Sequence, residues 1–367
     1  MRRAAATGFA SAASASPELA AEAVRAALSA VGCDYAHSLL LLLSAHFSNH
    51  TQPAVNAASR TARCLQVSGC TVPGLFTAED WALDQPAAAA LVLCGPICLS
   101  AVQPAAADGG IPLLTLSKPE VQLGSHLKTG PVRYGTLSTG SEGVAGGDVW
   151  SQCRLRSDGH AEARFLGART AIGVSRGLRV CSPPLQITGR MGFELFTLSH
   201  RPALDSLLEV APGAADETAA PHTRYFAAVL ETGAMPELAL EDGRYALVPI
   251  IGVNPHEKSV TLAARLPDHA ALVWVRHDPE TAAADSLRTL QEIGQEAPDP
   301  EFALMFSCIG RGPYFSRGAD RDLALLQERY PDLPVLGAYG AGEIGPVAGE
   351  NLLLSYSTVY ALFSAES

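Results

Sequence analysis

Two short stretches near the C-terminus carry side chains that are capable of chemistry. The first ends an apolar run, FALMFSCIGR, and holds Ser307, Cys308 and Arg311. A cysteine becomes a nucleophile where a nearby cation such as Arg311 lowers its pKa, and an arginine can instead bind a carboxylate through two hydrogen bonds. The alternative is that Cys308 is a small core residue and Arg311 a surface charge. The residue types alone favour that alternative.

The second stretch is the glycine-rich segment 340–346, GAGEIGP, which places a carboxylate among backbone groups. Glycines permit positive φ angles and let a ligand approach backbone N–H groups closely. Glu343 is then placed to bind an ammonium group or to accept a proton, with Tyr339, Gly340 and Gly342 beside it. An ordinary turn with a solvated glutamate is the alternative. The segment is neither a P-loop, because no Gly-Lys-Ser/Thr follows, nor a dinucleotide-binding turn, because no helix opens from it.

A related arrangement stands near the N-terminus. Ser44 ends the apolar run SLLLLLS, and Cys70 and Thr71 lie in the matching stretch, CLQVSGCTVPGLF. Leu75 stands where the C-terminal copy has Glu343, so only the C-terminal copy supplies an acid. We expect Ser44, Cys70 and Thr71 to belong to the same ligand-binding site.

Both copies predict the same order of elements, namely strand, helix, strand and glycine-rich turn. They share a Gly-x-x-x-x-Gly frame, formed by Gly69 and Gly74 in one copy and by Gly337 and Gly342 in the other. The duplication predicts an α/β fold in which two similar strand–helix–strand units lie in mixed sheets and form a pseudo-symmetric two-part body. Ligands of open α/β sheets bind at the carboxyl ends of strands, which is where the candidate side chains stand.

The rest of the chain divides into further elements. Residues 17–31 have the apolar spacing of a helix, and residues 150–180 alternate as a β-meander would. The segment 211–222, APGAADETAAPH, has the composition of a linker. It predicts an N-terminal domain over 1–215 and a C-terminal domain over 216–367.

Composition limits the class of protein and its partners. The chain has 367 residues, of which 48% are hydrophobic and 17% charged, and this is typical of a globular protein with a sizeable core. Its net charge of −11 excludes binding to a nucleic-acid backbone as the main function, because such binding needs clustered Lys and Arg.

The cysteine and histidine patterns predict neither a disulfide framework nor a metal site. No two of the eight cysteines form a Cys-x-x-Cys pair, and most lie in apolar segments, so we expect reduced thiols. His46 and His50 stand four residues apart, but no third ligand accompanies them. No cofactor is predicted.

The N-terminal region predicts a cytoplasmic protein. The residues after Met1-Arg2-Arg3 are rich in Ala and Ser and lack the apolar core of an export signal. The apolar run 39–43 is far too short to span a bilayer. We therefore expect a soluble protein that does not bind membranes.

The sequence resembles the FIST family, a sensory domain of intracellular signal-transduction proteins, over most of its length. The most specific matches are FALMFSCIGRGPYF, VLGAYGAGEIGPV and the closing YSTVYALF in the C-terminal half. The opening GFASAASASPELAAEAVRAAL, the pair LLLLLSAHF and SGCTVPGLF, and the central PLQITGRMGFELFTLSHRPAL resemble its N-terminal and middle parts. The resemblance implies a FIST N domain over 1–215 and a FIST C domain over 216–367.

Two departures from the family pattern stand out. An acidic Asp-Gly usually precedes Pro-Ala in the middle motif, whereas Ser199-His200-Arg201 stand there in this chain. The stretch 103–148 is also short and divergent. Because the sequence has no kinase, cyclase, methyl-accepting or F-box segment, the resemblance implies a stand-alone sensor that acts through a separate signalling protein.

The residues and the resemblance together predict a sensor for a small polar ligand, with amino acids as one class. Arg311 would bind the carboxylate of a zwitterion, and Glu343 its ammonium group. A direct Arg311–Glu343 clasp is the structural alternative. An enzyme with Cys308 as nucleophile is the functional alternative, and a scaffold without any ligand is a third.

Overall fold

The computed structural model divides into two compact units. The first combines Met1–Ser175 with Asp285–Ser367, and the second is Arg176–Ala284. The structure describes residues 4–102, 110–121, 123–127, 130–140, 146–211, 225–231, 233, 235–267, 269–315 and 318–366. The mixed α/β class expected from the sequence is confirmed. Neither unit begins or ends near residue 215, so the division into 1–215 and 216–367 stays a prediction. Residues 212–222 of the expected linker lie outside the described residues.

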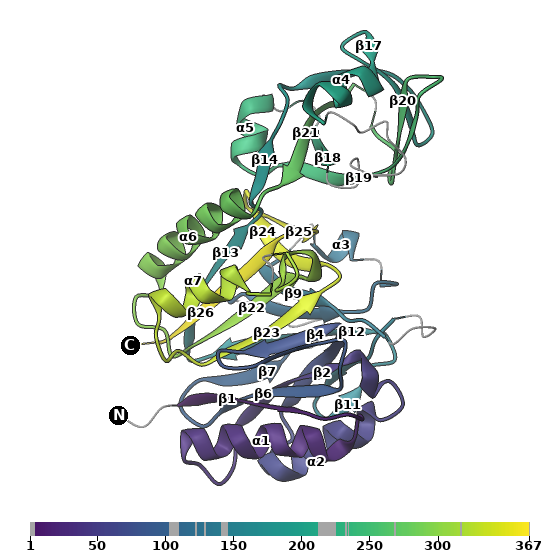
Figure 1. Cartoon of the computed structure of the whole chain (residues 1–367). Helices are drawn as coiled ribbons and strands as arrows, with labels where there is room; N and C mark the ends of the chain where they lie inside the picture. The colour runs from purple at the N-terminus through teal and green to yellow at the C-terminus, as the bar shows by residue number, and fades with distance from the viewer. Residues whose placement is uncertain are drawn as a thin grey trace. The chain divides into compact units, whose positions relative to one another are not determined.

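The first sheet of the first unit contains the N-terminal strand–helix–strand copy. In spatial order its strands are β1 (Ala5–Ser11), β6 (Ala87–Leu93), β2 (Ser38–Ser44), β3 (Val67–Val72), β10 (Val149–Ser151) and β11 (Arg154–Leu155). Strands β2 and β3 are parallel and the other pairs are antiparallel. Helices α1 (Pro17–Val31) and α2 (Thr51–Ala62) cover one face (Figure 1).

Local signals explain these elements. Pro17 opens α1, where its missing N–H costs nothing, and Gly32 ends the helix with a φ of 71°. The apolar run of β2 is buried on both faces. Leu41 and its alternate neighbours pack on the helices, whereas Leu40 and Leu42 point to the opposite side.

The second sheet contains the C-terminal copy. Its strands, in order, are β13 (Ala168–Ser175), β26 (Thr358–Ala365), β22 (Phe302–Cys308), β23 (Val335–Gly340), β4 (Gly74–Thr77) and β5 (Trp81–Leu83). Again only the central pair, β22 and β23, is parallel. Helix α7 (Arg321–Arg329) and the later part of α6 (Pro279–Glu296) pack on one face.

The two sheets have the same sequence of parallel and antiparallel pairings across all six strands. The register agrees as well, because Leu41 pairs with Gly69 in the first sheet as Met305 pairs with Gly337 in the second. The two copies thus lie in two sheets whose inner faces share one hydrophobic core, in which Leu42 and Phe306 lie. Superposition of the two copies stays a prediction.

The glycine frames do not form the turns expected from the sequence. Gly69 and Gly337 lie inside β3 and β23, and neither has a positive φ. A Cβ on Gly69 would lie 1.8 Å from the carbonyl oxygen of Leu41, so glycine is needed for close packing. Of the second glycines, Gly74 is the first residue of β4, and Gly342 lies in the bend between β23 and β24.

A third sheet completes the first unit. Its strands are β25 (Glu350–Leu354), β24 (Glu343–Val347), β9 (Arg133–Leu137), β8 (Leu113–Ser117), β12 (His160–Leu166) and β7 (Cys98–Ala101), and α3 (Gly124–Leu127) lies between β8 and β9 in the chain. Because β12 pairs with β7 and β8 whereas β13 pairs with β26, the expected strands over 150–180 exist, but the expected meander is wrong.

The second unit is one antiparallel sheet that closes on itself. Its strands are β14 (Leu178–Val180), β21 (Ala271–His277), β15 (Leu185–Met191), β16 (Glu194–Leu198), β20 (Ser259–Leu262), β19 (Tyr245–Asn254) and β18 (Tyr225–Leu230), with β17 (Arg201–Pro202), α4 (Ala203–Val210) and α5 (Pro236–Glu241) beside them. Closure results because β18 pairs with both β19 and β21. Inside, the indole of Trp274 donates to Ser206 Oγ at 3.0 Å.

Within the part of the chain that the structure describes, none of the helices combines the length and the apolar character that crossing a membrane requires.

Candidate functional site

The predicted C-terminal site residues gather at the carboxyl ends of β22 and β23, but on two faces of the sheet. Ser307 and Tyr339 face the helices α6 and α7, whereas Cys308 is on the inner side, next to Glu343. Alternation along a strand explains this separation, because consecutive side chains point to opposite faces. The candidate residues that we expected in one ligand-binding site therefore form two separate clusters, one on each face of the sheet.

The helix-facing cluster is built around Arg311. A short 3-10 turn, Ile309–Arg311, follows β22 and buries the guanidinium until the residue is only 2% exposed. Arg311 forms an ion pair with Asp322, in which Nη2 lies 2.9 Å from Oδ2 and 3.0 Å from Oδ1. Its Nη1 donates to the carbonyl oxygen of Ser175 at 2.9 Å. Arg311 is thus paired with a carboxylate of the protein, and the alternative clasp with Glu343 is not the pairing that the structure shows.

Hydroxyl groups donate further hydrogen bonds to the Asp322 carboxylate. Ser286 Oγ donates to Oδ1 at 2.6 Å, and Thr358 Oγ1 donates to Oδ2 at 2.9 Å. Ser307 Oγ lies 3.3 Å from Thr358 Oγ1. A buried ion pair persists only where such extra hydrogen bonds satisfy both charges. This cluster therefore has the composition of a structural network, although a ligand role for its members stays a prediction.

Sequence reasoning missed Asp322, and a local signal was available. Asp320 is the N-cap of α7 and accepts a hydrogen bond from the backbone N–H of Leu323 at 3.0 Å. An Asp before a helical pattern marks such a start. It places Asp322 in the first turn of the helix.

Tyr339 is linked to the same helix start. Its hydroxyl donates to Asp320 Oδ2 at 2.7 Å, and its ring is fully buried. Burial, together with the nearby charge of Asp322, raises the pKa of Asp320 to about 6. The folded state therefore binds a proton at Asp320 more tightly than the unfolded chain does.

This raised pKa predicts a pH-dependent contribution to stability. The contribution is complete below the ordinary pKa of 3.8 and is lost as pH rises through about 6. Asp320→Asn keeps a capping side chain but cannot ionise. Between pH 4 and pH 7 the variant should therefore lose about 2 kcal/mol less of its free energy of unfolding than the wild type does. Urea unfolding at pH 4 and pH 7 measures it, with the exposed Asp299→Asn as the control. Equal pH dependence in Asp320→Asn and the wild type would refute the assignment.

The inner cluster is built around Glu343, the first residue of β24. Its side chain is completely buried, and Oε2 accepts a hydrogen bond from Ser357 Oγ at 3.0 Å. Within the described residues, Oε1 has no hydrogen-bond partner. Burial raises the pKa of Glu343 well above its usual value, and the Ser357 hydrogen bond offsets this only partly. The carboxyl therefore keeps its proton to a higher pH than an exposed glutamate does.

Cys308 lies beside this carboxyl as a protonated thiol. It is 7% exposed, and burial together with Glu343 raises its pKa to about 12. Arg311 lowers the pKa only as a minor contribution. The thiolate that a nucleophile requires is therefore disfavoured at neutral pH, which removes the main support for the enzyme alternative.

Two glycines let neighbouring residues pack closely around Glu343. A Cβ on Gly340 would lie 2.3 Å from Thr136 Oγ1 and 3.4 Å from Glu343 Oε1. A Cβ on Gly342 would lie 3.0 Å from the Leu137 side chain. Neither glycine has a positive φ, so the expected positive φ is wrong, whereas the expected close approach of a ligand stays a prediction.

The N-terminal candidates are engaged with nearby backbone. Ser44 Oγ accepts a hydrogen bond from Ala87 N–H at 3.1 Å, and Thr71 Oγ1 donates to the carbonyl oxygen of Thr139 at 2.9 Å. Cys70 is fully buried in the core between the sheets. Ser44 is also the register equivalent of Cys308, not of Ser307, since each ends its strand. Their ligand role stays a prediction.

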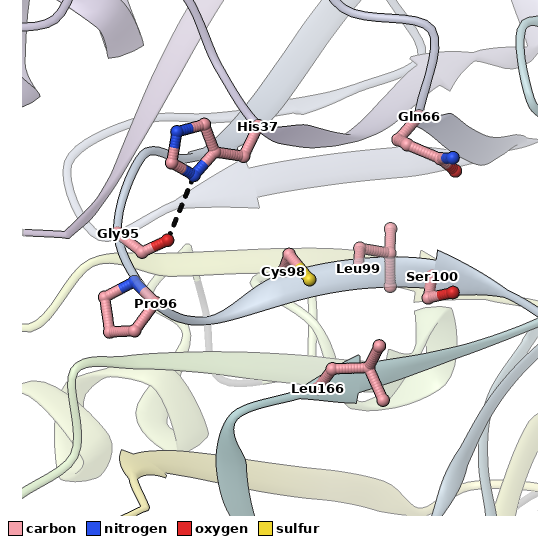
Figure 2. Close-up of a pocket in the computed structure, with 8 residues that line it drawn as sticks. All are labelled: His37, Gln66, Gly95, Pro96, Cys98, Leu99, Ser100 and Leu166. Carbon is pink, nitrogen blue, oxygen red and sulfur yellow. Dashed lines mark hydrogen bonds between the residues drawn. The ribbon is translucent and has the colours of Figure 1, made fainter.

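A surface cavity of about 370 Å³ lies at the opposite ends of β2 and β3 (Figure 2). His37 and Gln66 precede these strands, and the edge strand β7 supplies Cys98 and Ser100. The His37 imidazole Nδ1 lies 3.0 Å from the carbonyl oxygen of Gly95. Sequence reasoning missed this cavity, because no motif marks the amino ends of strands.

Comparison with known proteins gives one family and a set of relatives. Residues 203–346 match the FIST C domain model. An uncharacterized protein of Mycobacterium tuberculosis is 26% identical over 346 residues, which cover 86% of this chain and 88% of the relative. An uncharacterized protein of Mycobacterium bovis is 28% identical over 230 residues, which cover 60% of this chain and 58% of the relative.

Proposed function

Because this chain carries a FIST C domain, and FIST domains form a sensory and signal-transduction family, we propose that it is a sensor whose small polar ligand binds at Glu343. The family match supports the sensory role. The position of Glu343 at the carboxyl end of β23, where α/β sheets commonly bind ligands, supports the place.

The observation that carries the proposal is the unsatisfied oxygen of Glu343. Buried polar atoms are nearly always hydrogen-bonded, and leaving one without a partner costs about 1–3 kcal/mol. Oε1 lacks a partner within the described residues and lies 3.4 Å from the position that a Cβ on Gly340 would take. A ligand group that hydrogen-bonds to Oε1 would recover that cost, which makes the site favourable for a polar group.

The chemistry of Glu343 selects the ligand class. A protonated carboxyl pairs with an amide or a carboxylic acid, and it ionises when an ammonium group arrives. Arg311 is neutralised by Asp322, so the ligand's recognition rests on Glu343 and its neighbours. Amino acids and their amides are therefore the first compounds to test.

A thermal-shift screen tests the proposal. The twenty amino acids, with glutarate and succinate, are each added at 10 mM to the wild-type protein. A compound at 100 times its dissociation constant should stabilise the fold by about 2.7 kcal/mol. Glu343→Gln keeps the shape but not the acid and should lose this shift, whereas the exposed Glu350→Gln should keep it. A shift that survives Glu343→Gln would place the ligand elsewhere, and no shift with any compound would favour the scaffold alternative.

We further propose that the signal passes to a separate signalling protein in the cytoplasm. All eight cysteines are free thiols in the structure, which suits a reducing compartment. The net charge of −11 favours a partner with a basic surface. Pull-down with a tagged chain, with and without the compound that shifts the melting temperature, would test whether binding to a partner depends on the ligand.

A further inference from the structure

The third sheet repeats the strand pairings of the other two sheets. From β7 to β25 only its central pair, β8 and β9, is parallel, and all other neighbours are antiparallel. Gly135 is the third residue of β9, as Gly69 is of β3 and Gly337 of β23. A Cβ on Gly135 would lie 2.0 Å from the carbonyl oxygen of Thr115, so this glycine too is needed for close packing. The first unit therefore contains three parallel strand pairs of the same kind.

The carboxyl ends of these three strand pairs meet. The N–H of Thr139, two residues past β9, donates to the carbonyl oxygen of Thr71 in β3 at 3.0 Å. The N–H of Leu137, the last residue of β9, donates to the carbonyl oxygen of Gly342 after β23 at 2.9 Å. Strand β4, which follows β3 in the chain, pairs with β23. We call these four residues and Glu343 the three-sheet junction. Because Thr139 is partly exposed, the junction reaches the protein surface.

Ser138 lies on the same face of the third sheet as Glu343. Thr136 is the direct antiparallel partner of Glu343, and paired residues share a face. Ser138 stands two positions further along, and its N–H donates to the carbonyl oxygen of Ser117 at 2.7 Å, so the extended backbone continues through it. Leu137, between them, packs in a separate hydrophobic cluster on the outer side. Ser138 and Glu343 are thus diagonal neighbours, about 7–8 Å apart.

Ser138 is a second buried side chain at the junction that lacks a hydrogen-bond partner. It is 0% exposed, and among the residues that the structure describes nothing pairs with its Oγ. Ser38, equally buried at the start of β2, is different, because its Oγ accepts a hydrogen bond from the N–H of Leu99 at 2.7 Å. Buried polar groups are rarely left without partners. A bound molecule with two polar groups would supply partners to both Ser138 Oγ and Glu343 Oε1.

We propose that Ser138 is a specificity-determining residue of the Glu343 site and that the ligand is a small α-amino amide. Its ammonium group contacts Glu343, and its carbonyl oxygen accepts a hydrogen bond from the Ser138 hydroxyl. The two groups stand on adjacent carbon atoms of such a molecule, so one small ligand can contact two diagonal neighbours. This inference rests on the proposed function, because it extends the same site.

The chemistry of the two side chains favours the amide over the free amino acid. A carboxyl group ionises when an ammonium group arrives, and the two charges then compensate each other. Ser138 supplies a hydroxyl but no positive charge, and a buried carboxylate needs a counter-charge. Arg311, the cation that we expected to bind a carboxylate, is paired with Asp322. A neutral carbonyl therefore suits Ser138 better than the carboxylate of an amino acid does.

Glycinamide and propylamine test the two contacts, because both carry an ammonium group at neutral pH and only glycinamide has the carbonyl. Melting curves of the full-length protein are recorded over a concentration series of each amine. Glycinamide should raise the melting temperature of the wild type more than propylamine does. Ser138→Ala should weaken glycinamide binding by about tenfold and leave the two amines equal. Ser38→Ala, which removes a hydroxyl at the other end of β2, should keep the difference.

The ligand-free proteins supply a second measurement. Ser138→Ala should melt no lower than the wild type, because its hydroxyl has no hydrogen bond to lose among the described residues. Ser38→Ala should melt lower, because it leaves the buried N–H of Leu99 without its acceptor. A lower ligand-free melting temperature for Ser138→Ala would assign its hydroxyl a structural role and overturn the proposal.

The remaining outcomes separate this inference from the Glu343 site itself. If Glu343→Gln abolishes the glycinamide shift and Ser138→Ala keeps it, Ser138 lies outside the site and only this inference fails. If both variants keep the shift, the ligand binds elsewhere and the proposed function fails as well. Equal shifts with both amines in the wild type, or no shift with either, would also overturn the role of Ser138, and the amino-acid screen then decides on Glu343 alone.

Discussion

Replacing Arg311 by methionine is expected to lower the free energy of unfolding by about 3–5 kcal/mol, because the change leaves Asp322 as a buried charge without its counter-ion. Arg311 and Asp322 are 2% and 4% exposed, so solvent cannot compensate either charge. Urea unfolding at neutral pH measures the loss. This is the largest effect of a single substitution that we expect in the first unit.

Two further variants isolate the cause. Arg311→Met combined with Asp322→Leu removes both charges and should recover most of the loss, since buried ion pairs are often replaceable by apolar side chains. Arg288→Met breaks an exposed ion pair with Asp285 and should cost less than about 1 kcal/mol. A cost for Arg311→Met as small as that of Arg288→Met would contradict the role assigned to the buried pair.

Glu343→Gln is expected to make the protein less sensitive to rising pH. A raised pKa in the folded state means that Glu343 contributes stability that is complete below about pH 4.5 and is lost as pH rises toward its folded-state pKa. Within that window the wild type should lose roughly 1.4 kcal/mol per pH unit from this group. Glutamine stays neutral, so the variant should be as stable as the wild type in acid and more stable near neutral pH.

Melting curves of both proteins from pH 4 to pH 8 provide the measurement. Glu350→Gln, at an exposed position on the neighbouring strand β25, controls for the loss of one negative charge. Parallel pH profiles for the wild type and Glu343→Gln would show that the Glu343 carboxyl is ionised in the folded protein. The same profiles separate the Glu343 effect from that of Asp320, because the stability that Asp320 contributes is lost as pH rises through about 6.

The sequence predicted the elements at the C-terminal site better than the contacts made there. The apolar run before Cys308 and the glycine-rich stretch before Glu343 both became strand ends, because apolar runs and glycines are local signals. The pairing of Arg311 with Asp322 was missed, because that contact depends on how α7 returns to the sheet. Burial of Glu343 was missed for the same reason, since a glutamate between glycines resembles a solvated turn residue.

The sequence by itself determined the α/β class, the repeated strand–helix–strand order and the bounds of several elements, such as α1 and β22. It could do so because capping residues and the apolar period act within a few residues of each position. Only the tertiary structure decided that the two copies occupy separate sheets and that residues 176–284 form their own closed sheet. It alone gave Glu343 its raised pKa. Strand partners and desolvation depend on residues far away in the chain, and no local pattern specifies them.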